Sequence, residues 1–194
     1  MDIPVKLRLA YKTILFDEKT AVRQRTAREV LGASVIRVFR KGTRPHLISC
    51  LERVKIDGVL ALSNEAAFRN WFERELEKVA RVIRRHNPNR PQIEPGYKWG
   101  HASKILCLYC RDMVLRTRYF SEKDAVRISP WLYVPIDGIV IRQLRECGVA
   151  LCFRQIREID RREKFFALQD LLGAAAAEFG KPRVLFDDLW MKNR

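Results

Sequence analysis

The sequence predicts a mainly α-helical protein of about six to eight elements. Beyond residue 63, hydrophobic residues recur at every third or fourth position, which is the spacing of one face of a helix. These stretches begin at residues that cap helices and end at Gly or Pro. Of the 194 residues, 47% are hydrophobic, which is enough to bury a core. The length favours one domain, in which we distinguish an N-terminal region (residues 1–62) from a helical domain (residues 63–194).

The first predicted helix begins at Ser63 or Asn64, both good N-cap residues, and ends near His86. Its buried face is expected to consist of Phe68, Phe72, Leu76, Val79 and Ile83. A second face forms what we call the basic stripe, made of Arg74, Lys78, Arg81 and Arg85. This stripe fits two alternatives: contact with phosphate groups, or a solvated face that is ion-paired with neighbouring glutamates.

A connection rich in Pro and Gly leads to the second predicted helix, from about Trp99 to Arg118. One side of this helix is apolar, and Lys104 lies outside that side. An extended stretch over residues 129–135 then precedes the third predicted helix.

The third predicted helix begins at Asp137, a good N-cap residue, and ends at Gly148. A fourth, Ala-rich helix over residues 165–179 is stopped by Gly180 and Pro182. An apolar cluster over residues 185–190 is expected to dock as a last helical turn.

The sequence leaves the secondary structure of residues 1–62 open. Residues 5–15 and 35–39 could form short strands, with a turn at 42–45 before residues 47–51. Residues 26–38 fit a helix equally well, because their periodicity does not separate the two structures. We therefore expect a small N-terminal region that is either partly β-structured or helical.

The charge of the chain indicates a polyanionic partner. Its formal net charge is +15, and its 38 basic residues divide into 26 Arg and 12 Lys. Arginine suits bidentate phosphate contacts and stacking, so nucleic acid is the expected partner. A general bias toward Arg is the alternative. No segment reaches the length and hydrophobicity of a membrane span, and no basic amphipathic segment is free of acidic residues, so no membrane partner is expected.

The five cysteines are expected to be reduced, because an odd number without a secretory signal favours free thiols. Cys107 and Cys110 have the local spacing of a zinc site, which Cys147 and Cys152 could complete. The first pair lies in an apolar helical stretch, where small buried thiols are common. We therefore expect neither a metal nor another cofactor.

Two short segments carry most of the functional information. Residues 96–104, Gly-Tyr-Lys-Trp-Gly-His-Ala-Ser-Lys, form a glycine-punctuated turn that opens a helix with a lysine on its first turns. Residues 135–142, Pro-Ile-Asp-Gly-Ile-Val-Ile-Arg, place an aspartate at the start of another helix. In this order the two segments resemble the helix-hairpin-helix DNA glycosylase superfamily. The resemblance extends over residues 64–190 in helix order, and about twenty residues match. The Leu-Pro-Gly-Val-Gly hairpin core and the histidine that follows the aspartate are absent.

The resemblance implies a role for each matching residue. Lys104 corresponds to the nucleophile of the members that also act as lyases, and Asp137 to the aspartate that activates it or stabilises the developing sugar cation. Gly96 and Gly100 correspond to the hairpin glycines, whose main-chain N–H groups grip the DNA backbone. Arg142 corresponds to a basic residue one turn after the aspartate.

The chemistry of base excision explains these residue types. Cleavage of an N-glycosidic bond builds positive charge on the sugar, which a carboxylate such as Asp137 stabilises. A lysine that attacks the sugar must be neutral, and Arg111, one or two turns beyond Lys104, is a cation that favours loss of its proton. The extruded base would need stacking and hydrogen-bonding partners. Candidates for these contacts and for the neighbouring phosphates are Tyr97, Lys98, Trp99, His101 and Trp131.

Simpler interpretations remain open for the same residues. Lys104 could be an ordinary phosphate-binding or solvent lysine, and Asp137 could be only an N-cap. Trp99 and Trp131 could be packing aromatics.

Two functions are therefore expected as alternatives. The chain is either a DNA-binding protein that cleaves an N-glycosidic bond in DNA repair, using Lys104 and Asp137, or a catalytically silent basic module that binds nucleic acid or a nucleoprotein partner. DNA is the expected partner, a protein partner is compatible, and residues 1–62 would flank the DNA or dock that protein. The start of the chain lacks the order of a signal peptide, so we expect a cytoplasmic, nucleoid-associated protein.

Overall fold

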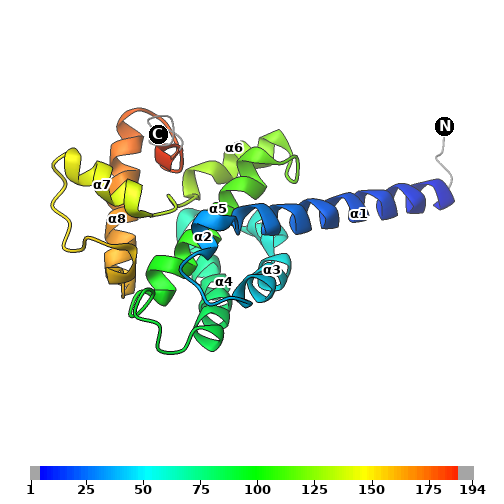
Figure 1. Cartoon of the computed structure of the whole chain (residues 1–194). Helices are drawn as coiled ribbons and strands as arrows, with labels where there is room; N and C mark the ends of the chain where they lie inside the picture. The colour runs from blue at the N-terminus through cyan, green and yellow to red at the C-terminus, as the bar shows by residue number, and fades with distance from the viewer. Residues whose placement is uncertain (1–4, 188–194) are drawn as a thin grey trace.

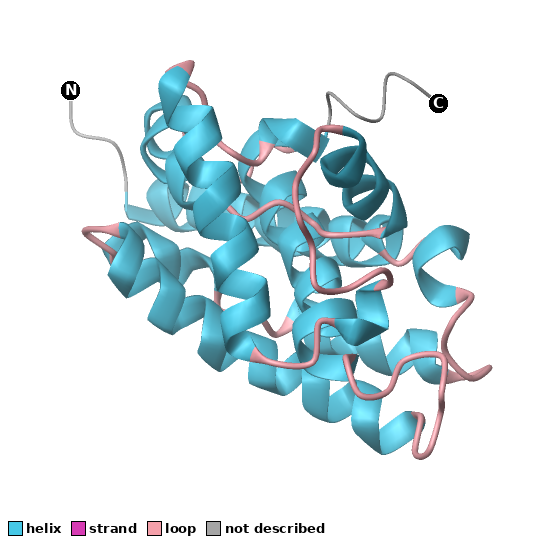
Figure 2. Ribbon diagram, turned by 90° about the vertical axis from the view of Figure 1, so that its left-hand side faces the viewer, coloured by secondary structure: helices cyan, strands magenta, loops and turns pink. Residues whose placement is uncertain are grey.

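The computed structural model describes the backbone of residues 5–187 and the side chains of residues 18–187. All regular structure within these ranges is helical, and they contain no strand. Figure 2 shows helices joined by loops throughout. The prediction of a mainly helical protein is confirmed.

The α-helices run in the order that Figure 1 colours from blue to red. They are α1 (Val5–Val30), α2 (Ala33–Ile36), α3 (Thr43–Glu52), α4 (Glu65–His86), α5 (Ser103–Arg111), α6 (Glu122–Ile128), α7 (Gly138–Glu146) and α8 (Arg162–Glu178). Shorter 3₁₀ and π turns lie between them: η1 (Ile56–Ala61), η2 (Tyr97–Ala102), η3 (Asp112–Arg116), η4 (Ser129–Trp131) and η5 (Ile156–Glu158). Residues 185–187 are also helical, and residues 188–190 of the predicted last turn lie outside the described part of the chain.

Helix α4 has the predicted bounds and the predicted buried face. The side chain of Asn64 accepts a hydrogen bond from Ala67 N at 2.9 Å, which caps the first turn. The five predicted core residues from Phe68 to Ile83 are all buried. The second predicted helix is also helical, but π turns η2 and η3 flank α5 within it.

The strands considered for residues 35–39 and 47–51 are wrong. Residues 47–51 lie in α3, where Leu47, Cys50 and Leu51 are buried at helical spacing. Gly42, with φ of 91°, precedes the first turn of this helix and does not turn a hairpin. Pro45 lies in that first turn, where no intrahelical N–H donor is needed. Residues 5–15, also considered as a strand, belong to α1.

Helix α1 is the longest element, and Figure 1 shows its N-terminal half extending past the other helices. Its C-terminal part packs on α3 and α5. One hydrophobic cluster takes side chains from both sides of residue 62, from Ala27 in α1 to Val184 after α8. The two regions distinguished in the sequence therefore share a core.

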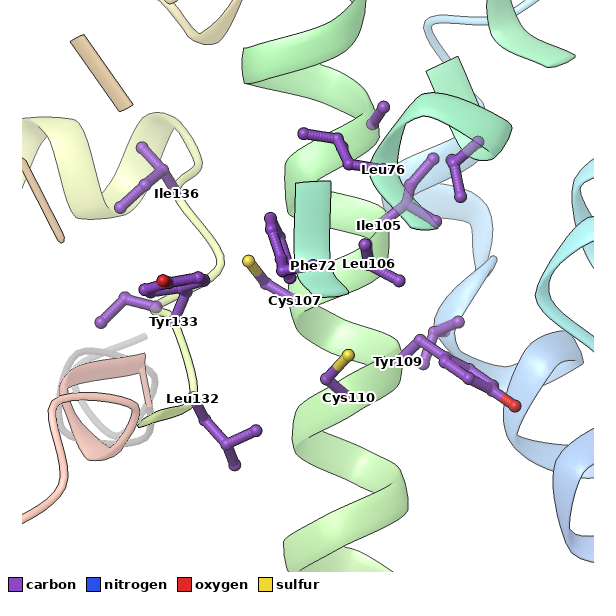
Figure 3. Packing of buried hydrophobic residues seen from close by; sticks show 14 of the residues in the cluster. Phe72, Leu76, Ile105, Leu106, Cys107, Tyr109, Cys110, Leu132, Tyr133 and Ile136 are labelled. Atoms are coloured by element: carbon purple, nitrogen blue, oxygen red, sulfur yellow. The ribbon is translucent and has the colours of Figure 1, made fainter. Parts of the chain in front are cut away.

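Helix α5 lies at the centre of this core. Tyr109 points toward the N-terminal helices, whereas the sulfurs of Cys107 and Cys110 point toward Leu132 and Tyr133 (Figure 3). Of the nine α5 residues, seven are buried, and only Lys104 and Leu108 are half-buried. Because these two are four residues apart, they lie on one edge of the helix.

The extended stretch predicted for residues 129–135 is confirmed for residues 132–135 and continues to Ile136, whereas residues 129–131 form the 3₁₀ turn η4, where Pro130 fits the first turn. Residues 132–136 are all buried. The fully buried Gln169 of α8 holds this stretch by its backbone. Gln169 accepts a hydrogen bond from Val134 N at 2.9 Å and donates one to Val134 O at 2.8 Å. The pair leaves neither the buried amide nor the buried peptide group without a partner.

Gly96 and Gly100 allow another segment to approach η2 closely. A Cβ atom on Gly96 would lie 2.3 Å from the carbonyl oxygen of Arg157, and one on Gly100 would lie 2.1 Å from that of Ile156. Both values are far shorter than any allowed contact, so only glycine lets the η5 backbone lie against η2.

We expect Gly100→Ala to lower the free energy of unfolding by about 3 kcal/mol or more, because the added methyl group must displace backbone atoms. Gly138→Ala is the matched control, since a Cβ there would meet nothing within 4 Å. The control should change stability by less than about 1 kcal/mol. Urea unfolding measures both, and equal effects would contradict the close approach.

Candidate functional site

A pocket of about 300 Å³ lies where four segments meet. These are the chain around α2, the first turn of α5 with the preceding η2, the start of α7, and residues 154–157. Its polar and charged lining residues are Ser34, Arg37, Gln92, His101, Lys104, Asp137, Arg154, Gln155 and Arg157. A larger hollow, of about 730 Å³ between α4, α6 and α8, contains none of the predicted site residues.

The two residues predicted as reactive groups meet in this pocket. Lys104 Nζ lies 3.3 Å from Asp137 Oδ2, although the residues are 33 positions apart in the chain. Their side chains are 18% and 19% exposed, so the ion pair is mostly buried but still reachable from the pocket. The pocket therefore presents an amine and a carboxylate within proton-transfer distance.

Asp137 is held from two directions. Its Oδ1 accepts hydrogen bonds from Ile139 N at 2.9 Å and Val140 N at 3.1 Å, which confirms the predicted N-cap. The buried stretch that Gln169 holds leads directly into it. The second carboxylate oxygen is thereby directed toward Lys104.

Three arginines that the sequence analysis did not single out line the same pocket: Arg37, Arg154 and Arg157. Arg157 donates a hydrogen bond to Pro91 O at 2.9 Å, which fixes its position. Asp137 is the only carboxylate among the lining residues, so the pocket has a surplus of positive charge. Such a surplus favours an anionic ligand. These arginines were missed because tertiary packing alone brings them close to Lys104: Arg154 and Arg157 through the contact of η5 with the glycines of η2, and Arg37 from the chain after α2.

His101 forms a buried wall of the pocket. It is 5% exposed, its ring meets Phe39 edge-on at 6.0 Å, and its Nε2 has no hydrogen-bond partner in the described part of the chain. Burial lowers the pKa of His101 to about 4; a hydrogen bond with the Gln92 backbone opposes this shift, and the charge of Lys104 adds to it. The imidazole is therefore neutral at pH 7.

Arg111 lies about two turns beyond Lys104 on α5, as predicted, but it does not line the pocket of Lys104. Arg111 is buried, makes hydrogen bonds to Asp112 and to Asp187, and lines a different hollow. Its charge is therefore balanced by two carboxylates, and its contribution to the chemistry of Lys104 is correspondingly small. An apolar helical stretch gave no signal that the distant Asp187 would reach this arginine.

The residues of the glycine-punctuated turn are mostly engaged within the fold. Trp99 packs on Phe165 and Phe166, with ring centroids 5.9 Å and 5.6 Å away. Lys98 pairs with Glu77 at 2.5 Å. Gly96 and Gly100 are buried, and Gly100 N donates to Gly96 O at 3.0 Å.

The remaining predicted contact residues are outside the pocket lining. Tyr97 lies under the guanidinium of Arg84 at 5.7 Å, and Trp131 lies under that of Arg127 at 5.5 Å. Arg142 is exposed on α7. The basic stripe is exposed as a whole, and within it Lys78 pairs with the buried Glu75 at 2.7 Å.

The cysteines separate into two environments. Cys107 and Cys110 are buried in the core, where burial raises the pKa of both thiols. Cys147 and Cys152 are exposed. Among the described side chains no three His, Cys, Asp or Glu residues are grouped so as to hold a metal ion.

We expect His101 to make stability depend on pH. Its pKa is lower in the folded chain (about 4) than in the unfolded chain (about 6.5), so acidification protonates the unfolded state first. The stability contribution is therefore complete above about pH 6.5 and is lost as the pH falls toward 4. Between pH 7 and pH 5 the loss is about 2 kcal/mol.

Urea unfolding at both pH values tests this dependence. His101→Gln should lose about 2 kcal/mol less than the unmodified chain on acidification. His46→Gln/His86→Gln, which removes the other two histidines, should keep most of the dependence. An unchanged pH dependence in His101→Gln would show that another group is responsible.

Comparison of the chain with protein-family models, with curated proteins and with solved structures finds no match. In the described residues, no helix is both long enough and apolar enough to cross a membrane. We therefore infer function from the residues and geometry of this chain alone.

Proposed function

We propose that the protein binds DNA, takes one extruded nucleotide into the pocket of about 300 Å³, and cleaves its N-glycosidic bond with Lys104 and Asp137. The observation that carries this proposal is the 3.3 Å contact between the two residues in a pocket with surplus positive charge. On this basis we also propose that the chain is a divergent relative of the helix-hairpin-helix DNA glycosylases.

DNA binding would rely on the positively charged side chains of the pocket and on the N-terminus of α7. Arg37, Arg154 and Arg157 are placed to neutralise phosphates on either side of the extruded nucleotide. The first turn of α7 adds the positive end of a helix dipole beside Gly138, where the pocket is open. The Arg-rich composition supplies the long-range attraction for DNA.

The chemistry begins with proton transfer from Lys104 Nζ to Asp137 Oδ2. The neutral amine then attacks C1′ of the sugar, the bond from C1′ to the base breaks, and its electron pair leaves with the base, which takes up the proton held by Asp137. Asp137 is thereby a carboxylate again and stabilises the positive charge on the sugar. The ring oxygen then leaves C1′ with its bonding electrons and takes a proton from Nζ, which produces a protonated Schiff base on Lys104.

A second candidate is a basic module that binds DNA without cleaving it. The observation that favours it is that Lys104 and Asp137 already satisfy one another, while Asp137 also caps α7. In that case the pair stabilises the pocket, and the arginines around it bind phosphate. DNA binding is common to both candidates, so experiments on catalysis separate them.

For the catalytic candidate we expect borohydride to trap the protein on duplex DNA that contains an abasic site. Lys104→Ala should abolish the covalent adduct, because the Schiff base forms on Nζ. Lys98→Ala, which removes a lysine of the preceding turn that pairs with Glu77, should leave the adduct in place. Absence of an adduct from the unmodified protein, with DNA binding retained, would exclude lyase chemistry through Lys104.

A base-release assay on a panel of damaged DNA duplexes tests the role of Asp137. Asp137→Asn should reduce base release by at least about 100-fold, since it removes the charge that stabilises the sugar cation. Asparagine is also an N-cap, so the fold and the DNA affinity should be retained. If the unmodified protein binds the panel but releases no base, the non-catalytic candidate holds.

A further inference from the structure

The pocket of Lys104 and Asp137 is one end of a longer groove. A second hollow, of about 510 Å³, shares Ser34 and Val35 with the pocket. A third hollow, of about 360 Å³, shares Arg25, Arg116 and Thr117 with the second. Neighbouring hollows have lining residues in common, so the three follow one another from α2 along α1. We call the three hollows together the α1 groove.

The accessible edge of α5 lies along this groove. Lys104 lines the pocket at one end, and Leu108, one helical turn further, lines the middle hollow. From there the groove follows the side of α1 that carries Arg25 and Lys19. Lys19 and Glu29, which both line it, are ten residues apart on α1 and thus about 15 Å apart along its axis.

The α1 groove has a surplus of positive charge. Its lining contains nine Lys or Arg residues against four Asp or Glu residues, a balance of five positive charges. Three of the four acidic residues are already paired with a groove cation: Glu29 with Arg25, Asp112 with Arg111, and Asp137 with Lys104.

Cations that pair with no described residue lie at both ends of the groove. The side chains of Arg37 and Arg154 at the pocket end, and of Arg118 at the far end, make no hydrogen bond or ion pair to any described residue. All three are exposed. Arg25, where the middle and far hollows join, is 64% exposed and lies 4.0 Å from Glu29. A surface pair of this length is weak, so Arg25 is available to a stronger anion.

We infer that the α1 groove binds the sugar–phosphate backbone of the DNA strand whose nucleotide enters the pocket. This inference rests on the proposed function and adds the path of the strand: away from Lys104, across Ser34 and Val35, and along α1 toward Arg118. A row of phosphates suits a groove that carries cations along its length. Arginine suits phosphate better than lysine does, and all but two of the groove cations are arginines.

The basic stripe of α4 is the alternative contact surface, and it does not line the groove. One of its four cations is already paired, since Lys78 contacts the buried Glu75. The groove, in contrast, is continuous with the reactive pair. We therefore place the main phosphate contacts of the strand on α1 and η3.

The test is the salt dependence of binding to a fluorescent duplex with one abasic site, followed by anisotropy between 50 and 300 mM KCl. Arg25→Gln/Arg118→Gln removes two groove cations. We expect the slope of log affinity against log salt to become smaller by about 1.8, and binding at 100 mM KCl to weaken by about 50-fold. Arg53→Gln/Arg161→Gln, which removes two exposed charges outside the groove, should weaken binding by less than about threefold.

The outcomes separate this inference from the proposed function. If the unmodified protein does not bind the duplex, both are overturned. If it binds, and the groove variant binds equally well with the same slope, only the path along α1 is overturned. Equal weakening in the groove variant and the control variant would mean general charge attraction and would also overturn the path. Thermal unfolding of both variants checks that they fold, since all four substituted side chains are exposed.

Discussion

The enclosure of α5 is the constraint on which the rest of the structure depends. Its residues pack against the N-terminal helices on one side and the segment before α7 on the other (Figure 3). A helix buried on most of its surface can carry a polar group only where an edge stays open. Lys104 and Leu108 form that edge in α5. The position of Lys104 at the pocket therefore follows from how the core closes around one helix.

Two backbone contacts complete the site around this edge. The buried pair between Gln169 and Val134 holds the extended stretch that ends at Asp137, so the carboxylate faces Lys104. The contact of η5 with the glycines of η2 brings Arg154 and Arg157 to the same pocket. The glycines thus act by allowing close packing, and the cations of the pocket depend on that packing. Both contacts join parts of the chain that are distant in sequence, which is why each is a property of the whole fold.

Local patterns predicted the elements wherever periodicity and caps agreed. In α4 and α7 the cap residue, the apolar spacing and the stop signal all indicate the same helix, and the structure has it. In residues 35–51 the local patterns conflict. The β-branched residues and the turn at residues 42–45 suggest a hairpin, whereas the buried residues Leu47, Cys50 and Leu51 follow helical spacing. Helical packing against α4 and α1 decides between them, because local propensity is a weak preference that tertiary contacts override.

The sequence by itself determined the helical class, the capping aspartate at residue 137 and the placement of Lys104 outside the apolar side of its helix, because these depend on residues a few positions apart. It also determined the positive charge, which is a matter of composition. The tertiary structure alone decided that Lys104 meets Asp137, that Arg111 is neutralised by Asp112 and Asp187, and that three further arginines line the pocket. Apart from the pair of chain neighbours Arg111 and Asp112, these contacts join residues that are tens of positions apart, and no local spacing encodes them. These contacts arise because the segments around α5 pack closely. Each side chain then takes the position that the neighbouring atoms leave open to it.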